Sequence, residues 1–219
     1  MRHLKDSYKH KGMRKQLVKE VASKGIRDER VLNALLKVPR HFFFDDIFDT
    51  HAYEDKAFPI GAGQTISQPY TVAFQTELLE IEPGDNILEI GTGSGYQGAI
   101  LAEMGANVYT IEYQKTLFDK TRKFLPKLGY SLNFFYGDGS KGLPQHAPYD
   151  GIIVTAGAPS VPNELLKQLK VGGRLVIPVG GGRTQTMYKL TLHPNNKVMK
   201  KEYNQFRFVP LLGEKGWNK

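Results

Sequence analysis

The chain is organised around Asn86-Ile87-Leu88-Glu89-Ile90-Gly91-Thr92-Gly93-Ser94-Gly95-Tyr96, where an apolar run breaks into a loop of alternate glycines. The run predicts a short buried strand. Glycines directly after a strand let the backbone turn sharply and leave room for a ligand to lie against exposed main-chain N–H groups. The apolar pattern resumes as an expected helix from Tyr96. Strand, loop and helix together predict a site for a nucleotide-type cofactor.

Two kinds of cofactor compete for this loop. Read from Gly93, the chain satisfies the dinucleotide pattern G-x-G-x-x-G. The strand, however, ends just before Gly91, and in that register the third glycine of the pattern would fall on Tyr96. The carboxylate of Glu89 would also repel a pyrophosphate and complement a cationic ligand. We therefore favour S-adenosylmethionine, which carries a sulfonium and an ammonium group, over a dinucleotide.

Short apolar runs alternate with helical segments along the rest of the chain, which is typical of a parallel α/β sheet. The expected strands are 86–90, 107–111, 132–136, 150–154 and 173–179, and the helices between them are 96–104, 114–126 and 161–169. Residues 187–192 and 198–208 predict antiparallel strands that close the sheet. We expect an α/β fold of the Rossmann-like class, with a mostly parallel sheet flanked by helices.

The region before this sheet is expected to be helical. Apolar residues recur at three- and four-residue spacing between residues 8 and 37, with a break at Gly25 and a helix cap at Asp28. Residues 58–69 are expected to form an irregular loop, and 71–79 a further helix. A chain of 219 residues requires no second domain. We expect one domain, made of N-terminal helices and an active-site loop (1–80), a cofactor-binding core (81–180) and C-terminal strands (181–219).

Composition limits the classes of function. The chain has a formal charge of +8 and no cysteine, which excludes disulfides, a thiolate zinc site and a cysteine nucleophile. The charge suits an acidic partner such as nucleic acid, yet it fits a protein without one equally well. The first residues lack the apolar core of a signal peptide, and no apolar run reaches membrane-spanning length. We expect a cytoplasmic protein with no membrane partner.

One group of potential metal ligands follows the N-terminal helical region. It consists of His41, Asp45, Asp46, Asp49 and His51. Their spacing matches no recognised ligand pattern, and the other histidines are scattered. We expect no metal site.

Functional side chains are expected where the parallel strands end. Glu112 ends the second strand about twenty residues beyond the glycine loop, where an acidic side chain can accept both ribose hydroxyls of an adenosine. Because nicotinamide and methyl-donor cofactors both contain adenosine, Glu112 does not distinguish them. Asp138 follows the third strand and can accept from an exocyclic amine such as that of adenine. A plain turn aspartate is the alternative interpretation of Asp138.

Two further segments bear on the chemistry. The fourth strand ends in Thr155-Ala156-Gly157-Ala158-Pro159 and lacks the Asn/Asp-Pro-Pro-aromatic tetrapeptide usual in amino-group methyltransferases that act on nucleic acids. Ser67 lies in the 58–69 loop without the G-x-S-x-G elbow or histidine base of a serine hydrolase. We therefore expect its hydroxyl to position a ligand rather than to act as a nucleophile.

Four segments together resemble the protein-L-isoaspartate O-methyltransferases, a family of class I S-adenosylmethionine-dependent methyltransferases. They are Gln64-Thr65-Ile66-Ser67-Gln68-Pro69, Leu88-Glu89-Ile90-Gly91-Thr92-Gly93-Ser94-Gly95-Tyr96, Gly137-Asp138-Gly139 and Phe208-Val209-Pro210-Leu211. The resemblance implies methylation of the free carboxylate of L-isoaspartyl residues in damaged proteins and peptides, which initiates their repair. It implies S-adenosyl-L-methionine as cofactor and S-adenosyl-L-homocysteine as product. Activity on D-aspartyl residues and the role of the basic first dozen residues stay open.

The resemblance also implies roles for the matching residues. Ser67 is expected to supply the catalytic hydroxyl. The expected cofactor contacts are Ile66, Ser67, Glu89, Gly91, Thr92, Gly93, Ser94, Gly95, Glu112, Tyr113, Asp138 and Gly139, and the expected substrate contacts are Thr65, Gln68, Val209, Pro210 and Leu211. We expect a monomer whose partners are isoaspartyl-containing proteins and peptides, not nucleic acid.

Three other functions stay open from the residues alone. They are an NAD-dependent dehydrogenase, a non-enzymatic basic binding module, and a class I methyltransferase that acts on a nucleic acid or a small molecule. The register of the glycine loop opposes the first. Acidic residues at three strand ends, Glu89, Glu112 and Asp138, oppose the second.

Overall fold

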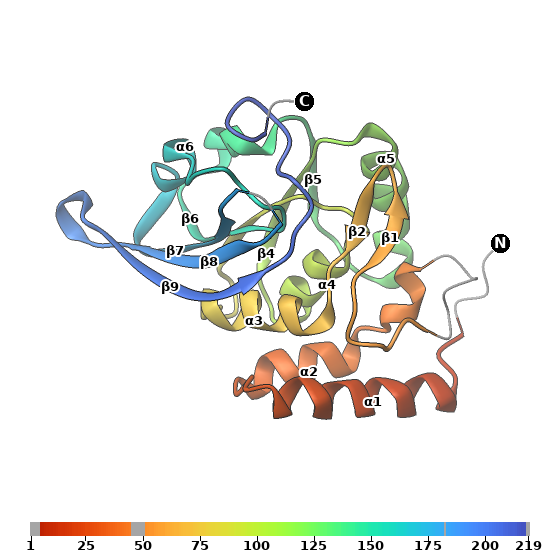
Figure 1. Cartoon of the computed structure of the whole chain (residues 1–219). Helices are drawn as coiled ribbons and strands as arrows, with labels where there is room; N and C mark the ends of the chain where they lie inside the picture. Colours follow the sequence, from red (N-terminus) through yellow and green to blue (C-terminus); the bar gives the residue numbers. More distant parts are fainter. Residues whose placement is uncertain (1–4, 45–50, 182, 218–219) are drawn as a thin grey trace.

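A seven-stranded sheet forms the centre of the protein, with strand order β5-β4-β3-β6-β7-β8-β9. The computed structural model describes residues 5–44, 51–181 and 183–217 (Figure 1). The strands are β3 (Asn86–Ile90), β4 (Asn107–Glu112), β5 (Asn133–Tyr136), β6 (Tyr149–Val154), β7 (Leu169–Val179), β8 (Gln185–Leu192) and β9 (Val198–Phe206). Strands β3 to β7 run parallel to one another, whereas β8 and β9 join antiparallel. The predicted fold class is confirmed.

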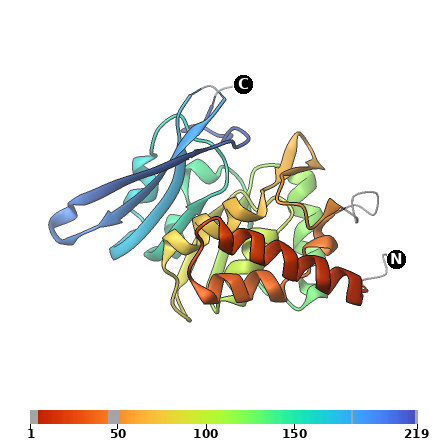
Figure 2. The ribbon, with the colours of Figure 1, turned by 60° about the horizontal axis from the view of Figure 1, so that its bottom comes forward.

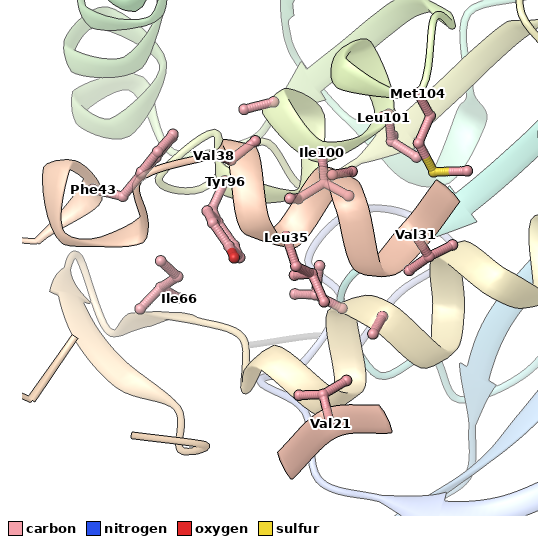
Figure 3. Packing of buried hydrophobic residues seen from close by; sticks show 14 of the residues in the cluster. Val21, Val31, Leu35, Val38, Phe43, Ile66, Tyr96, Ile100, Leu101 and Met104 are labelled. Atoms are coloured by element: carbon pink, nitrogen blue, oxygen red, sulfur yellow. The ribbon is translucent and has the colours of Figure 1, made fainter. Parts of the chain in front are cut away.

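The apolar core lies in two parts, one on each face of the sheet, because successive side chains of a strand point to opposite faces and helices pack on each face. The helices are α1 (Tyr8–Ser23), α2 (Glu29–Lys37), α3 (Pro69–Leu79), α4 (Tyr96–Glu103), α5 (Lys115–Phe124) and α6 (Asn163–Leu166). In β3, Ile87 joins the apolar cluster of α1 to α4, whereas Leu88 and Ile90 join the cluster on the other face with α6. Figure 3 shows part of the first cluster, where Tyr96 of α4 lies near Leu35 of α2.

Helices α1 and α2 form an outer layer over α3 and α4 (Figures 1 and 2). Gly25 follows α1 with a φ of +109°, a left-handed conformation that suits glycine. Asp28 caps α2, since its side chain accepts a hydrogen bond from the backbone N–H of Arg30. The predicted break and cap are thus confirmed. Within the described ranges, no helix is long and apolar enough to cross a membrane.

The segment before α3 contains regular structure that the sequence did not predict. Its residues form a hairpin of β1 (Phe58–Gly61) and β2 (Gln64–Ile66). Gly61 and Gly63 both have positive φ at the turn, which tight hairpins require. The expectation of an irregular loop at 58–69 is therefore wrong for the hairpin. The hairpin places Ser67 between β2 and the start of α3.

Two boundaries differ from expectation for identifiable reasons. The helix expected at 114–126 ends at Phe124, because Pro126 cannot donate a backbone hydrogen bond and the chain continues as a 3-10 turn. The helix expected at 161–169 is reduced to α6, because Leu169 already pairs with Tyr149 in the sheet. The division of the domain at residues 80 and 180 stays a prediction.

Candidate active site

A cavity opens at the carboxyl ends of β3, β4 and β6, the edge where open α/β sheets bind their ligands. Most of the residues expected at the cofactor line it, namely Ile66, Ser67, Gly91, Thr92, Gly93, Ser94, Glu112, Tyr113 and Gly139. Glu89, Gly95 and Asp138 are not among its lining residues. The structure therefore brings together expected cofactor residues from four separate segments of the chain.

The glycine loop at the cavity packs more closely against its neighbours than a residue with a side chain could. Gly91, Gly93 and Gly95 have φ values of +99°, +52° and +83°. A Cβ atom on Gly91 would lie 2.5 Å from Oγ1 of Thr155, and that hydroxyl donates to the Gly91 carbonyl at 2.8 Å. Gly95 is the N-terminal cap residue of α4. Gly91 is thus the first turn glycine, as the register predicted, and its close approach to Thr155 requires glycine.

Glu112 presents a carboxylate to the cavity from the end of β4. The side chain is 5% exposed, and its two oxygens accept hydrogen bonds from the backbone N–H groups of Gly93 (2.8 Å) and Gln114 (2.7 Å). A carboxylate oxygen has two lone pairs, so each oxygen can still accept from a ligand hydroxyl. Glu112 can therefore receive a pair of vicinal hydroxyls while it fixes the glycine loop.

Glu89 lies beneath the cavity. Its side chain is fully buried, and its Oε2 accepts a hydrogen bond from Oγ1 of Thr110 at 2.6 Å. Oγ1 of Thr110 also lies 2.7 Å from Oγ1 of Thr92 in the glycine loop. A Cβ on Gly98 would lie 2.9 Å from Oε2, so the carboxyl group faces α4. This geometry does not fit the expectation that Glu89 contacts a cationic ligand directly. Glu89 supports the loop through Thr110 instead.

Burial makes Glu89 a source of pH-dependent stability. Desolvation raises its pKa from 4.5 to about 8, because a buried site disfavours the charged form. The folded protein then keeps a proton that the unfolded chain has lost. The resulting stabilisation is complete below pH 4.5 and is lost as the pH rises toward about 8.

Glu89→Gln should remove this pH dependence, because glutamine is neutral at every pH. Relative to the wild type, the variant should gain stability as the pH rises from about 5 to about 8, by up to a few kcal/mol. Urea unfolding of both proteins at several pH values measures the difference. A difference that does not change with pH would show that Glu89 is ionised in the folded protein.

The carboxylate of Asp138 forms hydrogen bonds within its own turn and with the C-terminal segment. Its oxygens accept from the backbone N–H and the hydroxyl of Ser140 (2.9 and 2.7 Å) and from the backbone N–H of Glu214 (2.8 Å). A Cβ on Gly213 would collide with the same carboxylate. Only the adjacent Gly139 lines the cavity. The expected contact between Asp138 and adenine does not fit this arrangement, in which Asp138 fastens residues 213–215 near the site.

A second hollow adjoins the first beside the hairpin. Thr65, Ser67, Thr155, Val209 and Pro210 line both. Gln68 lines only the second hollow, and Leu211 only the first. Backbone hydrogen bonds from Gly157 to Val209 and from Leu211 to Gly157, both 2.8 Å, fix the C-terminal segment to the end of β6. Every residue expected to contact the substrate therefore lies at one or both hollows.

One group of potential metal ligands lies elsewhere, in the N-terminal layer. Among the described residues, Asp6, His10 and His41 bring ligand atoms within 4.8 Å of one another. Asp6 is already paired with Arg14, and Nδ1 of His41 lies 2.7 Å from the hydroxyl of Tyr53. Of the group considered from sequence, Asp45, Asp46 and Asp49 lie outside the described residues. The expectation of no metal stays a prediction.

Comparison with known proteins identifies the family. Residues 12–216 match the family described as protein-L-isoaspartate(D-aspartate) O-methyltransferase. The chain belongs to this family. A relative from Cytophaga hutchinsonii, named protein-L-isoaspartate O-methyltransferase, is 60% identical over 98% of this chain and 97% of its own. A relative of the same name from Christiangramia forsetii is 60% identical over 97% of this chain and 100% of its own. The resemblance drawn from the four sequence segments is confirmed.

Solved structures agree with this assignment. A protein-L-isoaspartate O-methyltransferase superposes with a TM-score of 0.79 at 28% identity, covering 92% of this chain and 66% of that protein. A second structure, described as a putative family member from Plasmodium falciparum in complex with S-adenosyl-L-homocysteine, gives 0.76 at 26% identity. It covers 91% of this chain and 98% of that one. The fold is thus that of a class I methyltransferase.

Several lining residues were missed from the sequence. Thr155 lines both hollows, Tyr96 and Gln114 line the first, and Arg207 and Phe208 line the second. Thr155 follows a parallel strand directly, so the strand-end rule could have singled it out. Arg207 and Phe208 lie beyond the last strand, and only the folded chain brings them beside Ser67. Phe208 begins the fourth of the resembling segments, but the sequence assigned it no contact. No sequence signal distinguishes Arg207 from an ordinary residue of a sheet edge.

Proposed function

We propose that the protein transfers the methyl group of S-adenosyl-L-methionine to the free carboxylate of L-isoaspartyl residues in damaged proteins and peptides, releasing S-adenosyl-L-homocysteine. The observation that carries this proposal is the junction of the two hollows at Ser67 and Thr155. One hollow offers a glycine loop and Glu112 to a nucleoside. The other offers backbone and hydroxyl groups to a peptide. D-Aspartyl residues are an alternative substrate within the same proposal.

The described residues fit an adenosine-containing cofactor. Lone pairs on both oxygens of Glu112 suit the two ribose hydroxyls, and Gly139 lines the same hollow beyond the end of β5. The cofactor supplies an electrophilic methyl group. The role of the chain is to hold the acceptor in line with it and to exclude water. We assign Ile66, Ser67, Tyr113 and the residues from Gly91 to Ser94 to this half of the site.

The acceptor needs no general base. A carboxyl group has an unperturbed pKa of about 4, so it is already a nucleophilic carboxylate at neutral pH. Attack on a sulfonium merges opposite charges into neutral products, which a pocket with little water favours. We propose that the Ser67 hydroxyl donates to this carboxylate, and that Thr65, Gln68 and residues 209–211 hold the peptide. The half-buried position of Ser67 at the junction supports this role.

Arg207 strengthens the assignment of the second hollow to an anionic group. It lines that hollow, and the chain as a whole carries a formal charge of +8. An exposed cation that lines the hollow raises the local concentration of carboxylates and disfavours a cationic substrate. Monomeric state and a cytoplasmic location remain parts of the proposal that rest on the sequence.

The chemical stability of the product tests the reaction class. After incubation with methyl-labelled cofactor and aged protein, the label should be released as methanol by mild alkali, because a carboxyl methyl ester hydrolyses readily. Label that survives alkali on protein or on added RNA would instead indicate methylation of nitrogen or a nucleic acid.

Two of the three other functions, the NAD-dependent dehydrogenase and the basic binding module, can be tested by ligand binding. S-adenosyl-L-homocysteine should raise the melting temperature and NAD should not, because only a bound ligand stabilises the folded state. A salt-dependent gel shift with RNA or DNA would favour the binding module instead.

A further inference from the structure

Arg40 is a buried cation that holds together three segments of the chain. It opens the short 3-10 helix η1 (Arg40–Phe43) and is 0% exposed. Its Nε donates to the carbonyl of Ala52 at 3.0 Å, and its Nη2 donates to the carbonyls of Lys56 (3.3 Å) and Ser67 (2.9 Å). Burial lowers the pKa of Arg40 to about 10, so the side chain remains charged at neutral pH. The guanidinium thus binds the backbone of Ser67, the residue at the junction of the two hollows.

The same guanidinium also contacts the residue that follows the glycine loop. Its Cζ lies 4.7 Å from the ring centroid of Tyr96, within the range of a cation–π interaction. Tyr96 begins α4, is 2% exposed and lines the first hollow. The ring of Tyr96 packs edge-on against that of Phe43 in η1, with ring centroids 5.2 Å apart, and Figure 3 shows both beside Ile66 at the end of the hairpin. Arg40 therefore contacts both the cofactor half and the substrate half of the site.

Asp55 fixes the next residues of the same segment. Its side chain is 3% exposed and accepts from the backbone N–H of Tyr70 (2.7 Å) and from Nε2 of Gln68 (3.0 Å). Gln68, the cap position of α3, makes no side-chain capping bond of its own. Asp55 thus supplies, from outside the helix, the acceptor that the first turn of α3 requires. Arg40 therefore holds the Ser67 carbonyl, and Asp55 holds the residues that directly follow Ser67.

We propose that Arg40 and Asp55 are positioning residues for methyl transfer, which fix the Ser67 backbone relative to the glycine loop. This inference rests on the proposed function. Neither side chain lines either hollow, so neither is expected to touch the reactants. Their effect is on alignment, and a displacement of about 1 Å at a reacting group can cost about 100-fold in rate.

Arg40→Lys tests whether the hydrogen bonds from Arg40 to the backbone carbonyls are needed for methyl transfer. Lysine keeps the charge but loses the planar fork that reaches several carbonyls at once. We expect kcat to fall about 10- to 100-fold, while the Kd for S-adenosyl-L-homocysteine changes by less than about threefold. Backbone amides of residues 66–68 and of Tyr70 should exchange faster with solvent than in the wild type.

Arg14→Lys is the matched control. Arg14 is also buried and also donates to a backbone carbonyl, that of Leu36, but it makes no hydrogen bond to residues 64–70. The control should lose stability without a comparable loss of kcat at a temperature where both variants are folded. Equal loss of kcat in the two variants would reduce Arg40 to a structural role and overturn the proposal.

Asp55→Asn keeps the proposal testable if Arg40→Lys does not fold. Its amide group would face the donors of Gln68 and Lys24, so kcat should again fall while cofactor affinity is kept. A kcat equal to that of the wild type, either in Asp55→Asn or in a folded Arg40→Lys, would refute the proposal that these residues position Ser67. Failure of the proposed function is distinguishable, because the wild-type protein itself would then transfer no methyl group to an isoaspartyl peptide.

Discussion

Replacing Glu112 with glutamine should weaken binding of S-adenosyl-L-homocysteine about 10- to 100-fold. The carboxylate accepts from the N–H groups of Gly93 and Gln114, and has lone pairs left for two ligand hydroxyls. A glutamine amide turns one of these acceptors into a donor. One buried N–H then loses its partner, which costs about 1–3 kcal/mol, and the ligand loses one acceptor.

Titration calorimetry of the variant and the wild type measures this change. Glu103→Gln is a suitable control, because Glu103 lies on α4, pairs with Lys37 and lines neither hollow. The control should bind the ligand as the wild type does. Unchanged affinity in Glu112→Gln would mean that the nucleoside lies elsewhere.

Ser67→Ala should lower kcat about 10- to 100-fold and leave the Kd for the cofactor within about threefold of the wild type. The reason is that a hydrogen bond to a charged group contributes about 1.5–3 kcal/mol, and we propose that the Ser67 hydroxyl donates to the reacting carboxylate. The substitution should leave both the glycine loop and the Ser67 carbonyl, to which Arg40 donates, in place.

Steady-state kinetics with an isoaspartyl peptide and direct measurement of cofactor binding separate these effects. Ser160→Ala, at an exposed position away from both hollows, serves as the control and should behave as the wild type. If Ser67→Ala loses cofactor affinity as much as it loses turnover, the hydroxyl belongs to the cofactor site and its assigned role is wrong.

Local patterns predicted which residues meet at the first hollow, for a physical reason. A strand, its glycine loop and the acidic end of the next strand are each encoded by a few adjacent residues. Parallel strands then bring those residues to one edge of the sheet. Gly91 and Glu112 lie where these rules place them.

Sequence patterns did not predict the direction of side chains or their contacts with distant residues. Glu89 adjoins the loop in sequence, but successive side chains in β3 point to opposite faces, which turns Glu89 toward α4. Asp138 follows its strand as expected, yet its oxygens are taken by Ser140 and by Glu214, a residue 76 positions later. Arg40 resembles any other basic residue until the fold places it against Ser67 and Tyr96. Propensity and spacing carry no information about such partners.

The central claim is that the acceptor is the carboxylate of an isoaspartyl residue. Two synthetic peptides of identical sequence, one with L-isoaspartate and one with normal L-aspartate, test it most directly when each is incubated with the protein and methyl-labelled S-adenosyl-L-methionine. We predict incorporation of label into the isoaspartyl peptide and background incorporation into its aspartyl twin. Equal labelling of the two peptides, or labelling of neither by protein that binds the cofactor, would contradict the claim.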